Sequence, residues 1–116
     1  KTETIMERSD FLRAIKMSSI FTSNTTNAID LVIDSVEQKI IIEAVAGQVG
    51  SQQAEVPAKI DGQNNNIRLN YRYILDCLNI LPNGQIAFKM IDDVAACQLS
   101  VPGNENYQYI IVPLRK

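Results

Sequence analysis

The chain has 116 residues, with 11 Lys or Arg against 13 Asp or Glu, and so a formal net charge of −2. Its 46% hydrophobic and 21% charged residues are typical of one ordinary globular domain over residues 1–116, and exclude a disordered tail or a small disulfide-stapled scaffold. The absence of His excludes His-based catalytic pairs and most catalytic zinc sites. The weak negative charge argues against a domain that holds nucleic acid by bulk electrostatics alone.

The two cysteines, Cys77 and Cys97, are far apart in the sequence and match no metal-ligand spacing. Apolar residues flank both, so we interpret them as small space-filling hydrophobes, with a structural disulfide as the minor alternative. Reduced thiols fit a cytoplasmic protein. No apolar run reaches the roughly 20 residues of a membrane span. The chain begins at Lys1 without a Met, and we expect it to be a piece of a longer chain.

The first half reads as a strand, a helix and three strands. Residues 2–7 predict a short strand, and Ser9 is the expected N-cap of the helix because its hydroxyl can accept an unpaired N–H of the first turn. Apolar residues recur at helical spacing over residues 11–20, and the turn formers at 23–27 end this helix. Pro57 indicates an edge position for the last strand. The three strands are expected at residues 29–33, 39–46 and 52–60.

The second half repeats this order. After a polar loop at residues 61–66, a short strand at 67–69 leads into a helix with Asn70 as its N-cap. The residues from Pro82 to Gly84 stop this helix. Its apolar stripe stands at positions i, i+3, i+4 and i+7, namely Ile74, Cys77, Leu78 and Leu81. Three more strands are expected at residues 85–91, 95–101 and 107–113.

The order βαβββ therefore occurs twice. This repetition predicts an α+β fold made of a duplicated unit that buries one core between its two copies. We expect the two helices to lie side by side on one face of an antiparallel sheet. Their outer faces would then remain free for another role.

Basic residues lie on these predicted outer faces. Arg13 and Lys16 are three positions apart and share a face of the first helix, and Arg72 lies on the polar side of the second. The simplest interpretation of these residues is that they solvate the outer faces of two helices. The more specific interpretation is that they form a lightly basic surface that contacts a phosphate backbone. No aromatic stacking platform accompanies it, which argues against sequence-specific recognition.

The C-terminal stretch is apolar almost to its last residue, whereas chain ends are usually polar and frayed. Residues 107–111 predict a last strand that completes the sheet. Val112, Pro113 and Leu114 follow at the point where proline ends the ladder, and they leave an apolar segment near the surface. Such a segment predicts a groove for the hydrophobic anchors of a peptide.

The sequence contains no recognisable catalytic constellation. Asp92 and Asp93 are adjacent, so in a strand they would point to opposite faces and could not act as an acid/base pair. The glycines at 47 and 50 lack the context of a phosphate-binding loop. No cofactor or metal site is predicted. These residues favour a binding or assembly module over an enzyme.

Several motifs resemble the C-terminal domain of the bacterial DNA polymerase III beta subunit family, the sliding clamps. Residues 70–81 (NYRYILDCLNIL) resemble the family helix F-N-x-x-Y-(L/V)-L-D-x-L-x-x-L, and residues 109–115 (YIIVPLR) resemble its terminal Y-(V/I)-(V/I)-M-P-(M/V)-R-L. Residues 11–21 resemble its first helix, and residues 92–96 loosely resemble the region before its penultimate strand. The resemblance covers both halves and implies the DNA-clamp fold.

Clamps of this family are head-to-tail homodimeric rings of three similar domains per chain, which enclose double-stranded DNA and do no chemistry. The resemblance implies that Arg13, Lys16 and Arg72 line the channel, and that Ile20 and Phe21 pack against the other subunit. It also implies a groove for short linear motifs, with a glutamine and large apolar anchors, from the polymerase, clamp loader, ligase and repair proteins. The groove residues would be Asn70, Tyr73, Val94, Ala96, Ile110, Val112, Pro113, Leu114 and Arg115.

This sequence departs from the family pattern at the groove. Val112 stands where the family usually has Met, which adapts its shape better than a stiff β-branched residue. Ala95 and Ala96 stand where Ser is common, and Lys116 replaces a terminal Leu. These differences bear on which peptides the groove prefers. The alternative function is an unrelated β-rich adaptor whose apolar C-terminus completes its own core, and a small enzyme is the least supported.

Overall fold

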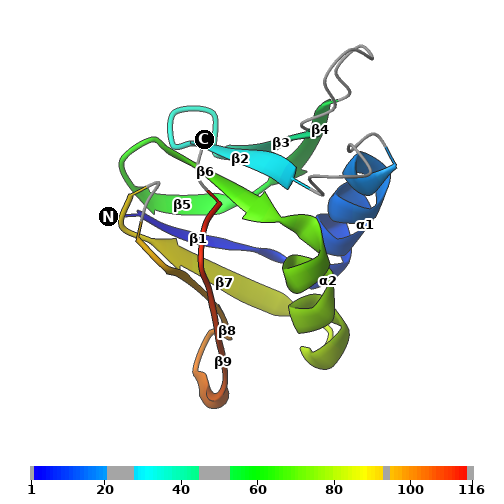
Figure 1. The fold of residues 1–116 in the computed structure, drawn as a ribbon. Helices are drawn as coiled ribbons and strands as arrows, with labels where there is room; N and C mark the ends of the chain where they lie inside the picture. Colours follow the sequence, from blue (N-terminus) through cyan, green and yellow to red (C-terminus); the bar gives the residue numbers. More distant parts are fainter. Residues whose placement is uncertain (1, 21–27, 45–52, 93–94, 115–116) are drawn as a thin grey trace.

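The computed structural model describes residues 2–20, 28–44, 53–92 and 95–114 (Figure 1). They form an α+β fold, as predicted. In chain order the elements are β1 (Thr2–Glu7), α1 (Arg8–Ser19), β2 (Ala28–Asp34), β3 (Lys39–Ala44), β4 (Gln53–Pro57), β5 (Lys59–Gly62), β6 (Asn65–Asn70), α2 (Tyr71–Ile80), β7 (Gln85–Met90), β8 (Cys97–Val101) and β9 (Asn104–Ile111).

The strands divide between two antiparallel sheets, whereas the sequence predicted one. The first sheet has the strand order β5-β1-β7-β8-β9, and the second has the order β4-β3-β2-β6. The two helices contact each other and lie side by side at one side of the molecule (Figure 1). The paired helices and the antiparallel pairing follow the prediction. Strand alternation alone could not assign each strand to a sheet, because it reports only which face of a strand is buried.

The duplication is visible in how the strands pair. The first strand of the first unit, β1, pairs with β7 of the second unit, and the first strand of the second unit, β6, pairs with β2 of the first. Both helices bury matching positions, Phe11 and Ile15 in α1 and Ile74 and Leu78 in α2. Each unit therefore contributes its first strand to the sheet built by the other, and neither sheet is complete without both units.

The predicted strand at 52–60 is divided at Ala58, where the chain passes from the second sheet to the first. Gln38, with a positive φ of 54°, bridges this crossing. Its main-chain carbonyl accepts the N–H of Ala58 at 3.1 Å, and its side-chain Oε1 accepts the N–H of Ile60 at 2.8 Å. These hydrogen bonds satisfy backbone N–H groups at the point where the chain leaves the strand pairing of the second sheet and enters that of the first. β4 is an edge strand, as Pro57 predicted.

The two helices begin differently. Asn70 caps α2 as predicted, because its Oδ1 accepts the N–H of Arg72 at 2.9 Å. The prediction of Ser9 as the N-cap of α1 is wrong: Glu7 takes that position without a side-chain bond, since β1 runs directly into the helix. Arg8 also joins the two helices, because its Nε donates to the carbonyl of Leu78, near the end of α2, at 2.7 Å.

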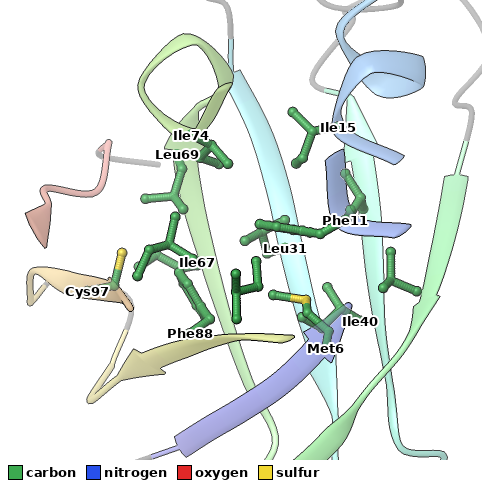
Figure 2. Close-up of a cluster of buried hydrophobic side chains, with 14 of the residues drawn as sticks. Met6, Phe11, Ile15, Leu31, Ile40, Ile67, Leu69, Ile74, Phe88 and Cys97 are labelled. Atoms are coloured by element: carbon green, nitrogen blue, oxygen red, sulfur yellow. The ribbon is translucent and has the colours of Figure 1, made fainter. Parts of the chain in front are cut away.

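The hydrophobic core lies between the two sheets and beneath α1 and α2. Figure 2 shows Met6 of β1, Leu31 of β2 and Phe88 of β7 converging on one space. Cys97 is buried at 1% exposure and Cys77 is half-buried, and both thiols are free, which agrees with their interpretation as small hydrophobes. Strands from both units thus meet in a shared core that also anchors the helices.

Two threonines on the core face of β1 differ in how their hydroxyls are satisfied. Thr2 Oγ1 donates to the carbonyl of Gln63 at 2.8 Å and accepts from Asn65 Nδ2 at 3.3 Å. Thr4 is fully buried, and its Oγ1 has no partner among the described residues. An unpaired buried hydroxyl costs about 1–3 kcal/mol of stability.

We predict opposite effects of the same substitution at these two positions. Thr4→Val removes an unpaired hydroxyl at nearly constant volume, so the free energy of unfolding should rise by about 1 kcal/mol. Thr2→Val removes both hydrogen bonds of the Thr2 hydroxyl, so the free energy of unfolding should fall by about 1–2 kcal/mol. Equilibrium urea denaturation measures both. Equal destabilisation by the two variants would contradict the assignment of Thr4.

Candidate functional site

The chain that follows β9 is fixed to the opposite sheet. The N–H of Leu114 donates to the carbonyl of Arg68, in β6, at 2.8 Å. This contact is the counterpart of the earlier crossing, in which the chain after β4 joins β1 as strand β5. The apolar chain end is therefore held against the fold, as its composition predicts.

Arg68 is itself held firmly in β6. Its Nε and Nη2 donate to the two carboxylate oxygens of Asp30, in β2, at 2.8 and 3.0 Å. The hydrogen bond with Asp30 raises the pKa of Arg68 further, so the guanidinium stays charged at all accessible pH values. A bidentate pair of this kind limits movement of both partners. The carbonyl that holds the C-terminal segment thus sits on a braced strand.

A cleft of about 370 Å³ opens between α2 and the end of β9. Its lining residues are Tyr73, Asp76, Cys77, Ile110, Ile111 and Val112. Three of them are largely exposed, Tyr73 by 57%, Ile110 by 65% and Val112 by 70%. Exposed apolar residues that are single need no explanation, but several around one concave surface are typical of a binding site.

A second cleft, of about 590 Å³, adjoins the first on the outer face of the five-stranded sheet. Ile110 lines both clefts. The second cleft also contains Ile91, exposed by 59%, and Ala96. The apolar surface thus continues from α2 around β9.

The structure brings some predicted groove residues together. Tyr73, Ile110 and Val112 line the cleft beside α2, and Ala96 lies in the neighbouring cleft. Asn70 serves as the helix cap. Pro113 and Leu114 are partly buried beyond Val112. Val94 and Arg115 lie outside the described residues.

Asp76, Cys77 and Ile111 line the cleft but are absent from the predicted set. Tyr73, Asp76 and Cys77 are spaced at i, i+3 and i+4, which places them on one face of α2. This spacing could have indicated that Asp76 and Cys77 lie beside Tyr73 in the groove. The sequence pattern places Cys77 in the apolar stripe of α2; in the structure it packs against the core, is half-buried and also lines the cleft. Ile111 is buried, so its sequence position indicates only a core residue. The structure shows that it also lines the cleft.

The two thiols near the cleft differ in environment. Burial raises the pKa of Cys97 to about 12, and its Sγ donates to the carbonyl of Ile111 at 3.4 Å. Burial and, to a smaller extent, the negative charge of Asp76 raise the pKa of Cys77. Both groups are therefore protonated thiols at neutral pH, and of the two only Cys77 lines the cleft beside α2.

The predicted basic residues lie on the outer faces of the helices. Arg13 and Lys16 in α1 and Arg72 in α2 are all exposed. Arg13 Nη1 lies 3.8 Å from Asp10 Oδ1, which offsets part of its charge. This surface is only lightly basic. Ile20 follows the end of α1 and is exposed by 76%, and Phe21 lies outside the described residues.

Within the parts of the chain that the structure describes, no group of His, Cys, Asp and Glu side chains could hold a metal ion. Over the same residues, neither helix is long and apolar enough to cross a membrane.

Solved structures of known proteins share this fold. The sliding clamp of Bacillus subtilis superposes with a TM-score of 0.93 at 26% identity, over all of this chain and 31% of that one. The DNA polymerase III beta subunit of Thermotoga maritima also gives a TM-score of 0.93, at 22% identity, over 100% of this chain and 31% of that chain. The two clefts and the lightly basic helices are thus carried on a fold that occurs in clamp proteins.

The sequence comparisons agree with this likeness. The beta sliding clamp of Synechococcus elongatus is 27% identical over 110 residues, which are 95% of this chain and 29% of that protein. The chain thus spans about three tenths of the length of the curated relatives that it matches. A family model for the C-terminal domain of the DNA polymerase III beta subunit matches residues 1–115. Because this match takes in nearly every residue, the chain belongs to the family of C-terminal domains of DNA polymerase III beta subunits.

Proposed function

We propose that this chain is the third domain of a non-catalytic sliding clamp, a cytoplasmic processivity factor that encloses duplex DNA and tethers the replicative polymerase. The observation that carries the proposal is the apolar cleft between α2 and the end of β9. It lies where the two most specific family motifs meet, with Tyr73 from one and Val112 from the other. The complete protein would be a head-to-tail homodimeric ring.

In this proposal the cleft receives short linear motifs from the polymerase, clamp loader, ligase and repair proteins. Large apolar anchors of the peptide would cover Tyr73, Ile110 and Val112, and burial of apolar surface contributes about 25 cal/mol per Å². The backbone hydrogen bond from Leu114 to Arg68 fixes the chain just after Val112, and so holds this wall of the cleft in place. A preformed wall reduces the ordering entropy that binding would otherwise cost.

The helix surface with Arg13, Lys16 and Arg72 would face the enclosed DNA. Few charges suit this role, because a ring holds DNA by its topology and must slide along it. Phosphate contacts carry no sequence information and let a protein slide along the duplex, so a few cations are sufficient. Ile20 and Phe21 would pack against the other subunit, and the 76% exposure of Ile20 leaves a surface for that contact.

We predict saturable binding of a fluorescent Q-x-x-L-F peptide, measured by anisotropy. Tyr73→Ala and Val112→Ala should each weaken binding by about tenfold, because each removes exposed apolar surface that lines the cleft. Ile80→Ala is the matched control, since Ile80 is exposed by 58% on the same helix but does not line the cleft. Unsaturable binding, or equal affinity in all four proteins, would reject the groove and favour an adaptor of another kind.

Cys77 offers a footprint of the bound peptide. The thiolate reacts with iodoacetamide, and the raised pKa of Cys77 leaves little thiolate at neutral pH, so alkylation should accelerate from pH 7 to pH 9. At pH 8.5, peptide at about four times its Kd should slow the reaction about fivefold. Mass spectrometry distinguishes Cys77 from Cys97, which should stay unmodified in the folded chain. Unprotected Cys77 under saturating peptide would place the peptide elsewhere.

We further predict that the 116-residue chain alone binds duplex DNA weakly at physiological salt, with a Kd above about 100 μM. The described helix surface has too few free cations for a tight complex without a closed ring. Anisotropy of a labelled duplex of about 20 base pairs measures this. Micromolar binding that depends on Arg13, Lys16 and Arg72 would contradict a topological mechanism.

A further inference from the structure

Among the described residues, one charged side chain lines the cleft beside α2. Asp76 stands between Tyr73 and Cys77, and the other lining residues are Ile110, Ile111 and Val112. The carboxylate therefore lies at the edge of an otherwise largely apolar surface. An apolar groove with a few placed polar groups uses the polar groups for specificity.

Asp76 adds little to the stability of α2. It is exposed, it forms no ion pair among the described residues, and it lies in the second half of α2, where a negative charge opposes the helix dipole. Arg72 is four residues N-terminal to it, which is the less favourable order for such a pair. The corresponding position of α1 holds Arg13, so the duplicated architecture does not require an acid there either.

The neighbouring cleft adds negative charge to the same surface. Its charged lining residues are Glu3, Asp61 and Lys89. Lys89 Nζ lies 3.5 Å from Glu3 Oε2, so this cation is already partnered. With Asp76, the described rim of the two joined clefts has three carboxylates and one ammonium group. Its excess charge is negative and complements a cation.

We propose that Asp76 selects partner peptides that have Lys or Arg next to their apolar anchors. This inference rests on the proposed groove. When the anchors cover the cleft they exclude water from beside the carboxylate, which strengthens its attraction to a nearby cation and its repulsion of an acid. Exposed pairs of this kind change affinity by about two- to fivefold at low salt. The preference weakens as added salt screens the charges.

The test uses pairs of Q-x-x-L-F peptides. The two peptides of a pair differ only in having Lys or Glu at one position, and the pairs cover each x position and the residue on either side of the motif. At one or more positions the wild-type chain should bind the Lys peptide about two- to fivefold more tightly than the Glu peptide in about 50 mM salt. Asp76→Asn should abolish this ratio, and Asp76→Lys should reverse it. The ratio should shrink toward one in about 0.5 M salt.

Glu37→Lys is the matched control, because it makes the same charge change at an exposed turn residue that lines neither cleft. It should leave the Lys-to-Glu ratio unchanged. Tight binding of every peptide with a ratio that does not respond to Asp76→Lys would overturn the role of Asp76 and leave the groove intact. An equal response to Glu37→Lys would also overturn it, since the effect would then follow net charge. No binding of any peptide would reject the groove and this inference together.

Discussion

The exchange of first strands between the two units is the constraint on which the rest of the structure depends. β1 completes the sheet of the second unit and β6 completes the sheet of the first, so the core between the sheets forms only when both units are present. Pairings between residues so far apart in the sequence must overcome loop-closure entropy. The buried side chains that meet between the sheets, such as Met6 and Phe88, supply the free energy that does so (Figure 2).

The candidate groove is a consequence of the same repetition. In each unit the chain leaves its last strand and crosses to the other sheet. The first crossing, at Ala58, continues as β5 and is bridged by Gln38. The second, after β9, makes one backbone bond through Leu114 and leaves Val112 exposed beside α2. Because the chain after β9 forms no full strand on the second sheet within the described residues, it leaves apolar surface that a peptide strand could cover.

Much of the fold could be predicted from residue patterns. Asn70 before an apolar stripe correctly placed the start of α2, and β-branched runs correctly located most strands. The failures have physical causes. Ser9 is as good a cap as Asn70, yet β1 continues into α1 and sets the boundary at Glu7. The residues on both sides of Ala58 favour strand, so their pattern does not show that the chain changes sheets between them.

For the candidate site, local sequence determined the residues on which the proposed recognition rests: an aromatic on α2, an apolar C-terminal segment and basic residues on the helix faces. The family resemblance already grouped Tyr73 with Val112. The tertiary structure alone decided that Asp76 lies at the edge of the cleft that they share and that Ile110 joins it to a second one. Periodicity assigns a residue to a face of its own element. Which faces meet depends on strand pairing over long sequence separations, and on the braced carbonyl of Arg68 that holds the chain end.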